Sequence, residues 1–330
     1  MSKNLNRREF CKKSLITSVG VTSACGLGEK ALLAATVNSA AAPTRKSPAT
    51  GLPMGKIGNV KVSRLIIGGN QFSGWSHSRD LKYLRELFLA YSTDEKIMET
   101  LQMAEENGIN TIITASSGYL NKYWKERGGK IQWIAQVHPQ SNDLTSDIKR
   151  AIDNGAIGAY VQGGVGESFV KNGRVDLLGK AVEFIKENGL IAGIGGHSVE
   201  VPIAVEKAQI DVDFYMKTLH HGNYWSATPK EDRIEFNVDS DSPYDHDNIW
   251  SITPERTIEF MKKVDKPWIA FKVLAAGAIH PREGFKYAFE NGADFVCAGM
   301  FDFQIIEDVI IAKDILSGNR GQKTEDRRQS

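Results

Sequence analysis

The sequence predicts an α/β protein of the (β/α)8 class, a TIM barrel with an N-terminal β-hairpin and a long loop after the sixth strand. Two observations lead to this prediction: short apolar segments recur along the chain, and amphipathic helical segments separate them. Strands that are apolar throughout and alternate with helices form a parallel sheet covered on both faces. Eight such segments in one domain fit a closed barrel better than an open sheet. The expected strands span residues 63–69, 110–115, 131–137, 157–162, 190–195, 212–217, 268–274 and 294–299.

The expected helices carry a repeated stop signal. They span residues 94–107, 144–154, 174–188, 254–264 and 281–291. All but the fourth end in an asparagine that is followed by a glycine, a pair that favours the left-handed conformation closing a helix. Gly58-Asn59 is a turn signal between two short alternating stretches, so a hairpin precedes the first barrel strand. No Gly-x-Gly-x-x-Gly turn follows that strand, which argues against a dinucleotide-binding open sheet.

The first 42 residues are expected to be an export signal. Asn6-Arg7-Arg8-Glu9-Phe10 is similar to a twin-arginine motif, and a weakly apolar run and the small residues Asn38–Ala42 follow it. We expect cleavage near Ala41 or Ala42, export through the twin-arginine machinery and a periplasmic mature protein. An ordinary signal or a membrane anchor is the alternative. The expected domains are the signal at 1–42, a linker at 43–53, the barrel at 54–317 and a disordered tail at 318–330.

Composition places the chain among ordinary globular proteins. The 330 residues are 41% hydrophobic and 25% charged, with a formal net charge of +1, so nothing points to a nucleic-acid surface. Of three cysteines only Cys297 would remain after cleavage, which excludes an internal disulfide. Beyond the signal no apolar run is long enough to span a bilayer, so we expect no stable membrane insertion after cleavage.

Residues 190–225 carry the densest set of reactive side chains. The apolar run 190–195 is followed by His197, and the run 212–217 leads into Lys217, His220 and His221. The segment between them is expected to be a helix with Ser198 as a candidate N-cap. Parallel barrels place their active sites at the carboxyl ends of the strands, so we expect an active site here.

Other expected strand ends add polar side chains to the same rim. The first carries Asn70, Trp75 and His77, the third His138, the fourth Gln162 and the seventh Lys272. Of seven histidines, six lie in or near these strand ends or in the loop after the sixth strand. We expect at least three histidines to share one site, and Asn70, Trp75, His77 and Gln162 to contact the substrate.

Two segments resemble the aldo-keto reductases. Gly55–Gly69 is similar to that family's N-terminal hairpin and first strand, and Gly108–Ala115 to its second strand. The resemblance implies a barrel whose bottom is closed by the hairpin. It does not extend to the reductase chemistry, because the family's catalytic aspartate aligns with Ile113 and its lysine and histidine are replaced by segments 136–138 and 162–164.

Without these residues NADP is not an expected cofactor. Ketone reduction by NADPH lacks its proton donor here, unless Tyr119 or His138 has taken over by another geometry.

The first chemistry that suits the rim is metal binding. His138, His197 and His220 would hold a divalent metal through neutral imidazoles and leave positions open for substrate hydroxyls or water. Candidate further ligands are Asp245, Asp247 and Asp302.

The second chemistry needs no metal. The histidines act as acid and base near neutral pH, while Lys217 or Lys272 stabilises an enolate or forms an imine. For both lysines an ion pair inside the barrel is the alternative. For His221 the alternative is a position that faces solvent.

The stretch from His221 to Thr253 is too long for an ordinary connection, and we expect it to cover the barrel mouth. Tyr224 and Trp225, with Trp75, offer aromatic faces that suit sugar rings. We therefore expect an exported enzyme that acts on a carbohydrate or a sugar-derived carbonyl compound by acid–base chemistry, as a lyase, an isomerase or a hydrolase. The alternatives are a divergent NADP-dependent oxidoreductase of the aldo-keto reductase type and a barrel that binds glycan without turnover.

Overall fold

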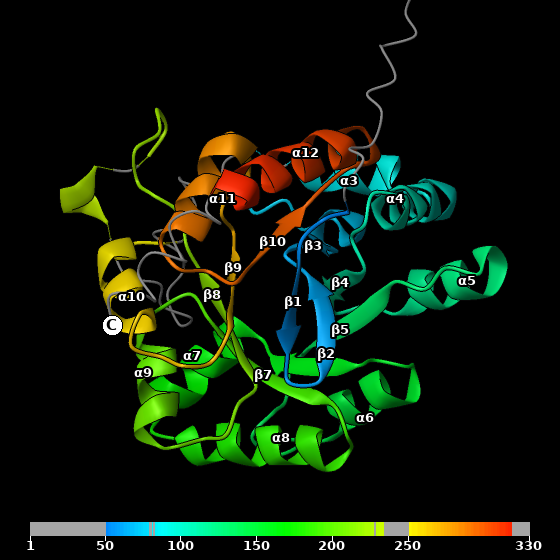
Figure 1. Ribbon diagram of the computed structural model, residues 1–330. Coiled ribbons are helices and arrows are strands. Elements are labelled where there is room, and N and C mark those ends of the chain that lie inside the picture. Colours follow the sequence, from blue (N-terminus) through cyan, green and yellow to red (C-terminus); the bar gives the residue numbers. More distant parts are fainter. Residues whose placement is uncertain (1–50, 79–80, 82, 228, 234–250, 319–330) are drawn as a thin grey trace, which may run out of the picture. The chain divides into compact units, whose positions relative to one another are not determined.

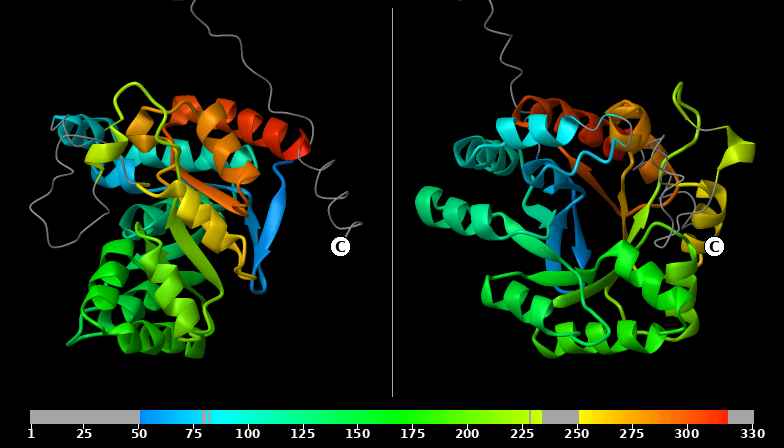
Figure 2. Two further views of the ribbon diagram at one scale, coloured as in Figure 1. Left: turned by 90° about the vertical axis from the view of Figure 1, so that its left-hand side faces the viewer. Right: turned by 180° about the vertical axis from the view of Figure 1, so that it is seen from behind.

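The computed structural model describes residues 51–78, 81, 83–227, 229–233 and 251–318. Eight parallel strands close into a barrel in the order β10-β3-β4-β5-β6-β7-β8-β9, and helices surround them (Figure 1; Figure 2). The strands are β3 (Leu65–Gly68), β4 (Thr111–Thr114), β5 (Gln132–Val137), β6 (Gly158–Val161), β7 (Ile191–Gly196), β8 (Phe214–Thr218), β9 (Trp268–Phe271) and β10 (Phe295–Gly299). Each overlaps its predicted segment, and the predicted (β/α)8 barrel is confirmed. The predicted signal, most of the linker and residues 319–330 lie outside the described residues.

A hairpin closes the amino-terminal end of the barrel, as predicted. It consists of β1 (Met54–Ile57) and β2 (Val60–Ser63), which pair antiparallel. Ile57 and Val62 are fully buried and pack in one cluster with residues that begin barrel strands, among them Ile191 and Phe214. The opposite end of the barrel, where the strands finish, is therefore the end left for a site.

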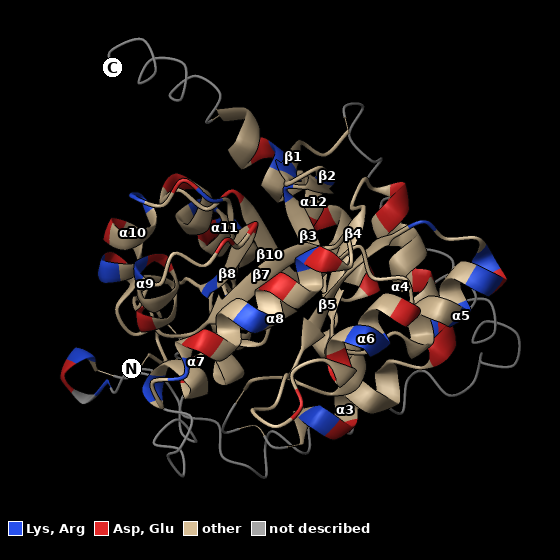
Figure 3. Ribbon diagram, turned by 90° about the horizontal axis from the view of Figure 1, so that it is seen from below, with Lys and Arg blue, Asp and Glu red and all other residues tan. Residues whose placement is uncertain are grey.

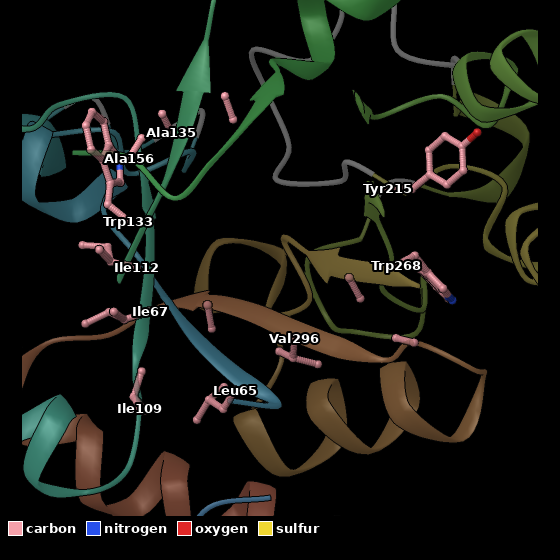
Figure 4. Packing of buried hydrophobic residues seen from close by; sticks show 14 of the residues in the cluster. Leu65, Ile67, Ile109, Ile112, Trp133, Ala135, Ala156, Tyr215, Trp268 and Val296 are labelled. Carbon is pink, nitrogen blue, oxygen red and sulfur yellow. The ribbon is translucent and has the colours of Figure 1, made fainter. Parts of the chain in front are cut away.

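The core has two layers, because successive side chains of a strand face opposite sides. One layer fills the barrel and includes Ile134 and Phe214. The other lies between the strands and the helices, and Figure 4 shows members of it such as Ile112 and Trp133. Burial on both faces explains why the strands are apolar throughout.

The helices bear out the asparagine-glycine stop signal. They are α3 (Leu84–Tyr91), α4 (Asp94–Glu106), α5 (Gly118–Arg127), α6 (Ser146–Asp153), α7 (Gly163–Lys171), α8 (Val175–Glu187), α9 (Glu200–Lys207), α10 (Pro254–Met261), α11 (Pro281–Glu290) and α12 (Asp302–Gly318). At Asn107, Asn154, Asn188 and Asn291 the side-chain amide donates to the carbonyl oxygen four residues earlier, at 2.8 Å each time. The glycine that follows each has a φ between 78° and 100°, which an L side chain adopts only at a cost.

The α9 helix begins one residue later than predicted, at Glu200. The predicted cap Ser198 still accepts a hydrogen bond from the Glu200 backbone N–H, at 3.2 Å. The first turn of the helix therefore keeps a side-chain acceptor.

Charged residues of both signs alternate along the outer helices. Figure 3 shows them intermingled on α4, α5, α6 and α8, and ion pairs such as Lys122–Asp94 and Lys186–Asp211 join neighbouring elements at 2.8 and 2.5 Å. Within the part of the chain that the structure describes, no helix has both the length and the apolar character needed to cross a bilayer.

Asp308 on α12 is a buried carboxyl group that weakens the fold as the pH rises. Its side chain is 2% exposed, and its Oδ2 has no hydrogen-bond partner among the described residues. Burial, with a smaller contribution from Glu307, raises the pKa of Asp308 from 3.8 to about 7. The neutral form is therefore the one that the folded protein tolerates.

Replacing Asp308 by asparagine should stabilise the protein at alkaline pH. The folded pKa of Asp308 lies above its unfolded value. Its contribution to the stability of the wild type is therefore complete below pH 3.8 and is lost as the pH rises through 7. Asparagine does not titrate, so the variant should gain about 2 kcal/mol over the wild type between pH 5.5 and pH 8.5. Urea unfolding at the two pH values measures this gain. An equal stability difference at both pH values would mean that Asp308 titrates normally.

Candidate active site

The carboxyl ends of the strands form one rim of the barrel, and most of the predicted site residues lie on it. His138, Gln162 and His197 directly follow β5, β6 and β7, and Lys272 follows β9. Lys217 lies inside β8, one residue before the end of the strand.

His197 is held by a carboxylate that the sequence analysis did not single out. Glu167 lies on α7, and its Oε1 accepts hydrogen bonds from the backbone N–H groups of His197 and Ser198, both at 2.6 Å. Its Oε2 faces His197 Nδ1 at 3.3 Å. The two side chains are only 6% and 7% exposed. A carboxylate at one ring nitrogen fixes both the orientation and the tautomer of an imidazole.

The Glu167 carboxyl group is favoured in its protonated form at neutral pH. Burial raises its pKa to about 8, although hydrogen bonds from Ser198 and His197 and the charges of Lys217 and Lys272 oppose the shift. An acid with a pKa near neutrality beside an imidazole suits general acid–base chemistry.

Lys217 fixes the main chain of His197 from the other side. Its Nζ donates to His197 O at 2.6 Å and to the carbonyl and hydroxyl oxygens of Thr218, both at 2.9 Å. The Thr218 hydroxyl in turn donates to His197 O at 2.9 Å. These acceptors match the three donors of an ammonium group, and the side chain is 2% exposed. An amine so enclosed is poorly placed to form an imine, and we assign Lys217 as a positioning residue for His197.

Lys272 brings a second positive charge to the surroundings of Glu167. Its charge acts on the Glu167 carboxyl group, and its Nζ lies 5.9 Å from the centre of the Phe271 ring, which is itself 5.5 Å from the His197 ring. Unlike Lys217, the Lys272 side chain is partly exposed. We call Glu167, His197, Lys217, Thr218 and Lys272 the acid–base cluster.

Lys272 also sits in a backbone conformation that L residues rarely adopt. Its φ is +56°, and Ala275 and Ala276 in the same turn have φ values of +45° and +55°. Non-glycine residues with positive φ cost free energy and concentrate at functional sites. Lysine and alanine carry no sequence signal for this conformation, so the strained turn could not be predicted.

A second imidazole on the rim has its own carboxylate. The backbone N–H of His138 donates to Asp147 Oδ2 at 2.6 Å, and its Nδ1 lies 3.6 Å from the same oxygen. Burial would raise the pKa of Asp147, but the hydrogen bonds from His138 and the charge of Arg150 outweigh it, and the pKa is lowered. The His138 Nε2 faces Gln136 Nε2 at 3.3 Å, and Gln136 Oε1 accepts from the Tyr160 hydroxyl at 2.6 Å.

His220 is committed to the backbone around it. Its Nε2 accepts from the Ser251 backbone N–H at 3.0 Å, and its Nδ1 lies 2.8 Å from His221 O, to which it donates. Both ring nitrogens are thus engaged in closing the loop after β8, although the side chain is buried. The geometry gives His220 a structural role.

The predicted metal triad of His138, His197 and His220 is not brought together around one point. In the described residues no three side chains of histidine, cysteine, aspartate or glutamate are grouped so as to hold a metal ion. Asp302 is bound instead to the Tyr91 hydroxyl at 2.6 Å and to Lys96 at 3.2 Å. Asp245 and Asp247 lie outside the described residues. Metal binding stays a prediction that no contact of the described residues supports.

Four of the side chains predicted to contact the substrate bond or pack within the protein, and the two predicted tryptophans are exposed. Gln162 caps α7, because its Oε1 accepts from the Val165 backbone N–H at 3.1 Å, and Tyr224 packs edge-on against His220 at 6.0 Å. Asn70 and His77 pair with each other at 2.9 Å on the surface. Trp75 and Trp225 are 62% and 93% exposed, so these two rings present faces to solvent.

Tyr119 is not arranged to replace the reductase tyrosine. Its hydroxyl donates to Thr114 Oγ1 at 2.6 Å, and its ring packs edge-on against Phe72 at 5.6 Å. Burial raises the pKa of Tyr119, and the Thr114 hydrogen bond offsets only part of the rise. A partly buried phenol fixed in this way packs at the β4 end.

Comparison with known proteins supports the fold and leaves the chemistry open. No family model matches the sequence, and no curated protein matches it. Two solved structures of aldo-keto reductase-like proteins from Pseudomonas aeruginosa share the fold. One is 16% identical with a TM-score of 0.56 and covers 82% of this chain and 97% of that chain. The other is 16% identical with a TM-score of 0.54 and covers 80% and 95%. At such identity the likeness concerns the barrel alone.

Proposed function

We propose that the protein is a barrel enzyme that moves a proton at a carbon next to the carbonyl group of a sugar-derived compound, with His197 as the acid–base residue. The observation that carries the proposal is that hydrogen bonds hold the His197 backbone and ring from two sides. Glu167 binds its backbone N–H and its Nδ1, while Lys217 binds its carbonyl oxygen. Such restraint from three side-chain contacts is what a positioned catalytic imidazole requires.

The roles of the cluster follow from its chemistry. Once Glu167 has lost its proton, its Oε2 would accept the Nδ1–H of His197, and the ring would carry its lone pair on Nε2, the nitrogen that would accept the substrate proton. Because the pKa of Glu167 is about 8, the activity should rise as the pH passes through that value. The carbanion that forms would place negative charge on the carbonyl oxygen. Lys272, a partly exposed ammonium group whose charge acts on Glu167, would stabilise that charge. Trp75 and Trp225 would contact the apolar face of a sugar ring.

Replacing His197 by asparagine should lower the rate of proton exchange by a factor of about 100 to 10,000. The measurement is the loss of C–H signals by NMR in D₂O, on native glycosides, glycosides oxidised at one ring hydroxyl, and ketopentoses. His280→Asn is the matched control, because His280 caps α11 by accepting from the Arg282 backbone N–H and asparagine caps equally well. Equal rates for the two variants would exclude His197 as the base.

The same samples address the alternatives. A barrel that binds glycan without turnover would show no exchange, and its ligand affinity would survive His138→Ala and His197→Ala. An aldo-keto reductase-type enzyme would quench NADPH fluorescence saturably. Export by the twin-arginine route stays a prediction; replacing Arg7 and Arg8 by lysine should keep the chain out of the periplasmic fraction.

A further inference from the structure

We infer that an apolar face formed by α3 and the start of α12 binds a second copy of this chain, so that the protein is a homodimer. The two helices follow β3 and β10, which are neighbouring strands of the barrel. Eight large hydrophobic side chains are exposed in the part of the chain that the structure describes. Six of them make up what we call the α3 face: Leu81, Tyr83, Leu87, Leu89, Tyr91 and Phe303.

The α3 helix is apolar, and none of its residues is buried. Its inner side packs on one aromatic ring, because Phe88 and Tyr91 meet Phe301 edge-on at 5.1 and 5.4 Å. Its outer side is a stripe at the spacing of one helix face, and every member is exposed: Tyr83, Glu86, Leu87 and Ala90. A surface helix normally turns its apolar stripe toward the core, so apolar residues on the outer side indicate a partner.

Phe303 extends the α3 face onto α12. Its ring stacks on Phe301 at 5.5 Å with an angle of 10° between the ring planes, and it lies 6.4 Å from the Tyr91 ring. The Tyr91 hydroxyl donates to Asp302 Oδ1 at 2.6 Å, which ties α3 to the start of α12. These contacts hold the face in shape before any partner arrives. Binding therefore has few side chains to order.

The area of the α3 face fits a homodimer. Each of the six side chains is between 37% and 70% exposed. At roughly 200 Å² for a whole side chain of this size, together they present on the order of 600 Å². A stable interface takes about 800 Å² from each partner, and a little over half of that area is apolar. The face can therefore supply the apolar share of one side of a standard interface.

The charges on the α3 face favour a second copy over a lipid surface. The helix carries one basic and one acidic residue, Arg85 and Glu86, and both are exposed. A helix that binds an anionic membrane has an excess of lysine and arginine on its polar side. The nearby Lys96 is paired with Glu99 and Asp302, at 2.6 and 3.2 Å. In a copy related by a two-fold axis, Arg85 of each chain can meet Glu86 of the other, so the face complements itself.

The shape of the exposed stripe also complements itself. Tyr83, whose backbone is already helical, and Ala90 stand seven residues apart, at the two ends of the stripe. In an antiparallel pair of α3 helices, the Tyr83 ring of one copy would lie over Ala90 of the other. Large and small side chains interdigitate in this way in close-packed contacts. The two-fold axis would then cross α3 near Leu87.

Sedimentation velocity of the purified protein tests the inference. At roughly 10 µM the wild type should sediment as a dimer. Leu87→Glu and Phe303→Glu should each raise the dissociation constant at least about 10-fold, because each places a carboxylate inside an apolar interface. Ser317→Glu is the matched control, since it adds the same charge at an exposed position near the other end of α12. This control should stay dimeric.

The changed side chains are exposed in the single chain, so circular dichroism of both monomeric variants should match that of the wild type. A dimer weakened by both variants and not by the control would support the inference. Weakening by only one variant or by neither, or a wild type that is monomeric at roughly 100 µM, would overturn it.

A lipid surface has its own signature. A monomeric wild type that cosediments with vesicles of phosphatidylcholine and phosphatidylglycerol, and two variants that do not, would assign the α3 face to a membrane. That result would also overturn the homodimer.

Discussion

Glu167→Gln should remove most of the proton-transfer activity and leave the fold intact. The Oε1 atom accepts both backbone N–H groups, and the glutamine oxygen can keep these bonds. The glutamine amide would then replace Oε2 opposite His197 Nδ1. Above pH 8 the ionised wild-type Oε2 accepts the Nδ1–H, whereas an amide N–H donates. In the variant Nδ1 would therefore become the acceptor and the ring proton would move to Nε2, where the base needs its lone pair. We expect kcat above pH 8 to fall by a factor of up to about 10,000, the loss seen when an imidazole is held in the wrong tautomer.

Two measurements separate this effect from a structural one. Nitrogen NMR of the histidine rings should report the change of tautomer at His197 directly. Glu206→Gln is the control, since Glu206 accepts from the Tyr215 hydroxyl and pairs with Lys266 away from the cluster, and its activity should match the wild type. An active Glu167→Gln variant with an unchanged His197 tautomer would contradict the assignment.

The stability of this variant should depend on pH in one direction. The folded pKa of Glu167, about 8, lies above its ordinary value of 4.5. The contribution of the Glu167 carboxyl group to the stability of the wild type is therefore complete below pH 4.5 and is lost as the pH rises through 8. Glutamine does not titrate, so the stability of the variant relative to the wild type should increase between pH 5 and pH 9.

The fold was open to prediction because its signals are local. Each barrel strand is a short apolar run, since both of its faces are buried. Each asparagine-glycine pair carries its own geometry, because the amide bonds back within the helix and the glycine supplies the positive φ. Neither signal depends on a residue far along the chain.

The site was open to prediction only in part, because its function depends on distant partners. His138, His197 and Lys272 could be placed on the rim from strand ends alone. Glu167 lies 30 residues before His197, and only the packing of α7 on the β7 end brings them together. His197 and His220 look equivalent in sequence, yet the Ser251 backbone N–H donates a hydrogen bond to the ring of His220. Which nitrogen is committed to the backbone is decided by loop closure, which no spacing rule reports.

Lys272→Gly should stabilise the protein and inactivate it. The φ of +56° at Lys272 costs an L residue about 1 kcal/mol, a cost that glycine does not bear. Lys272→Ala keeps this cost and also removes the charge, so glycine should exceed alanine by about 1 kcal/mol in the free energy of unfolding. Both variants should lose activity by a factor of about 100 to 1,000, because both lack the ammonium group that we propose stabilises the developing oxyanion.

Ala276→Gly separates the effect of the backbone conformation from the effect of the Lys272 charge. Ala276 has the same left-handed conformation, with a φ of 55° and a ψ of 30°, but it carries no group that could act on a substrate. This variant should gain a similar stability and keep its activity. If it lost activity as Lys272→Gly does, the turn would matter through its rigidity. If only the lysine variants lost activity, the strained backbone would be the means by which the chain holds an ammonium charge near the Glu167 carboxyl group.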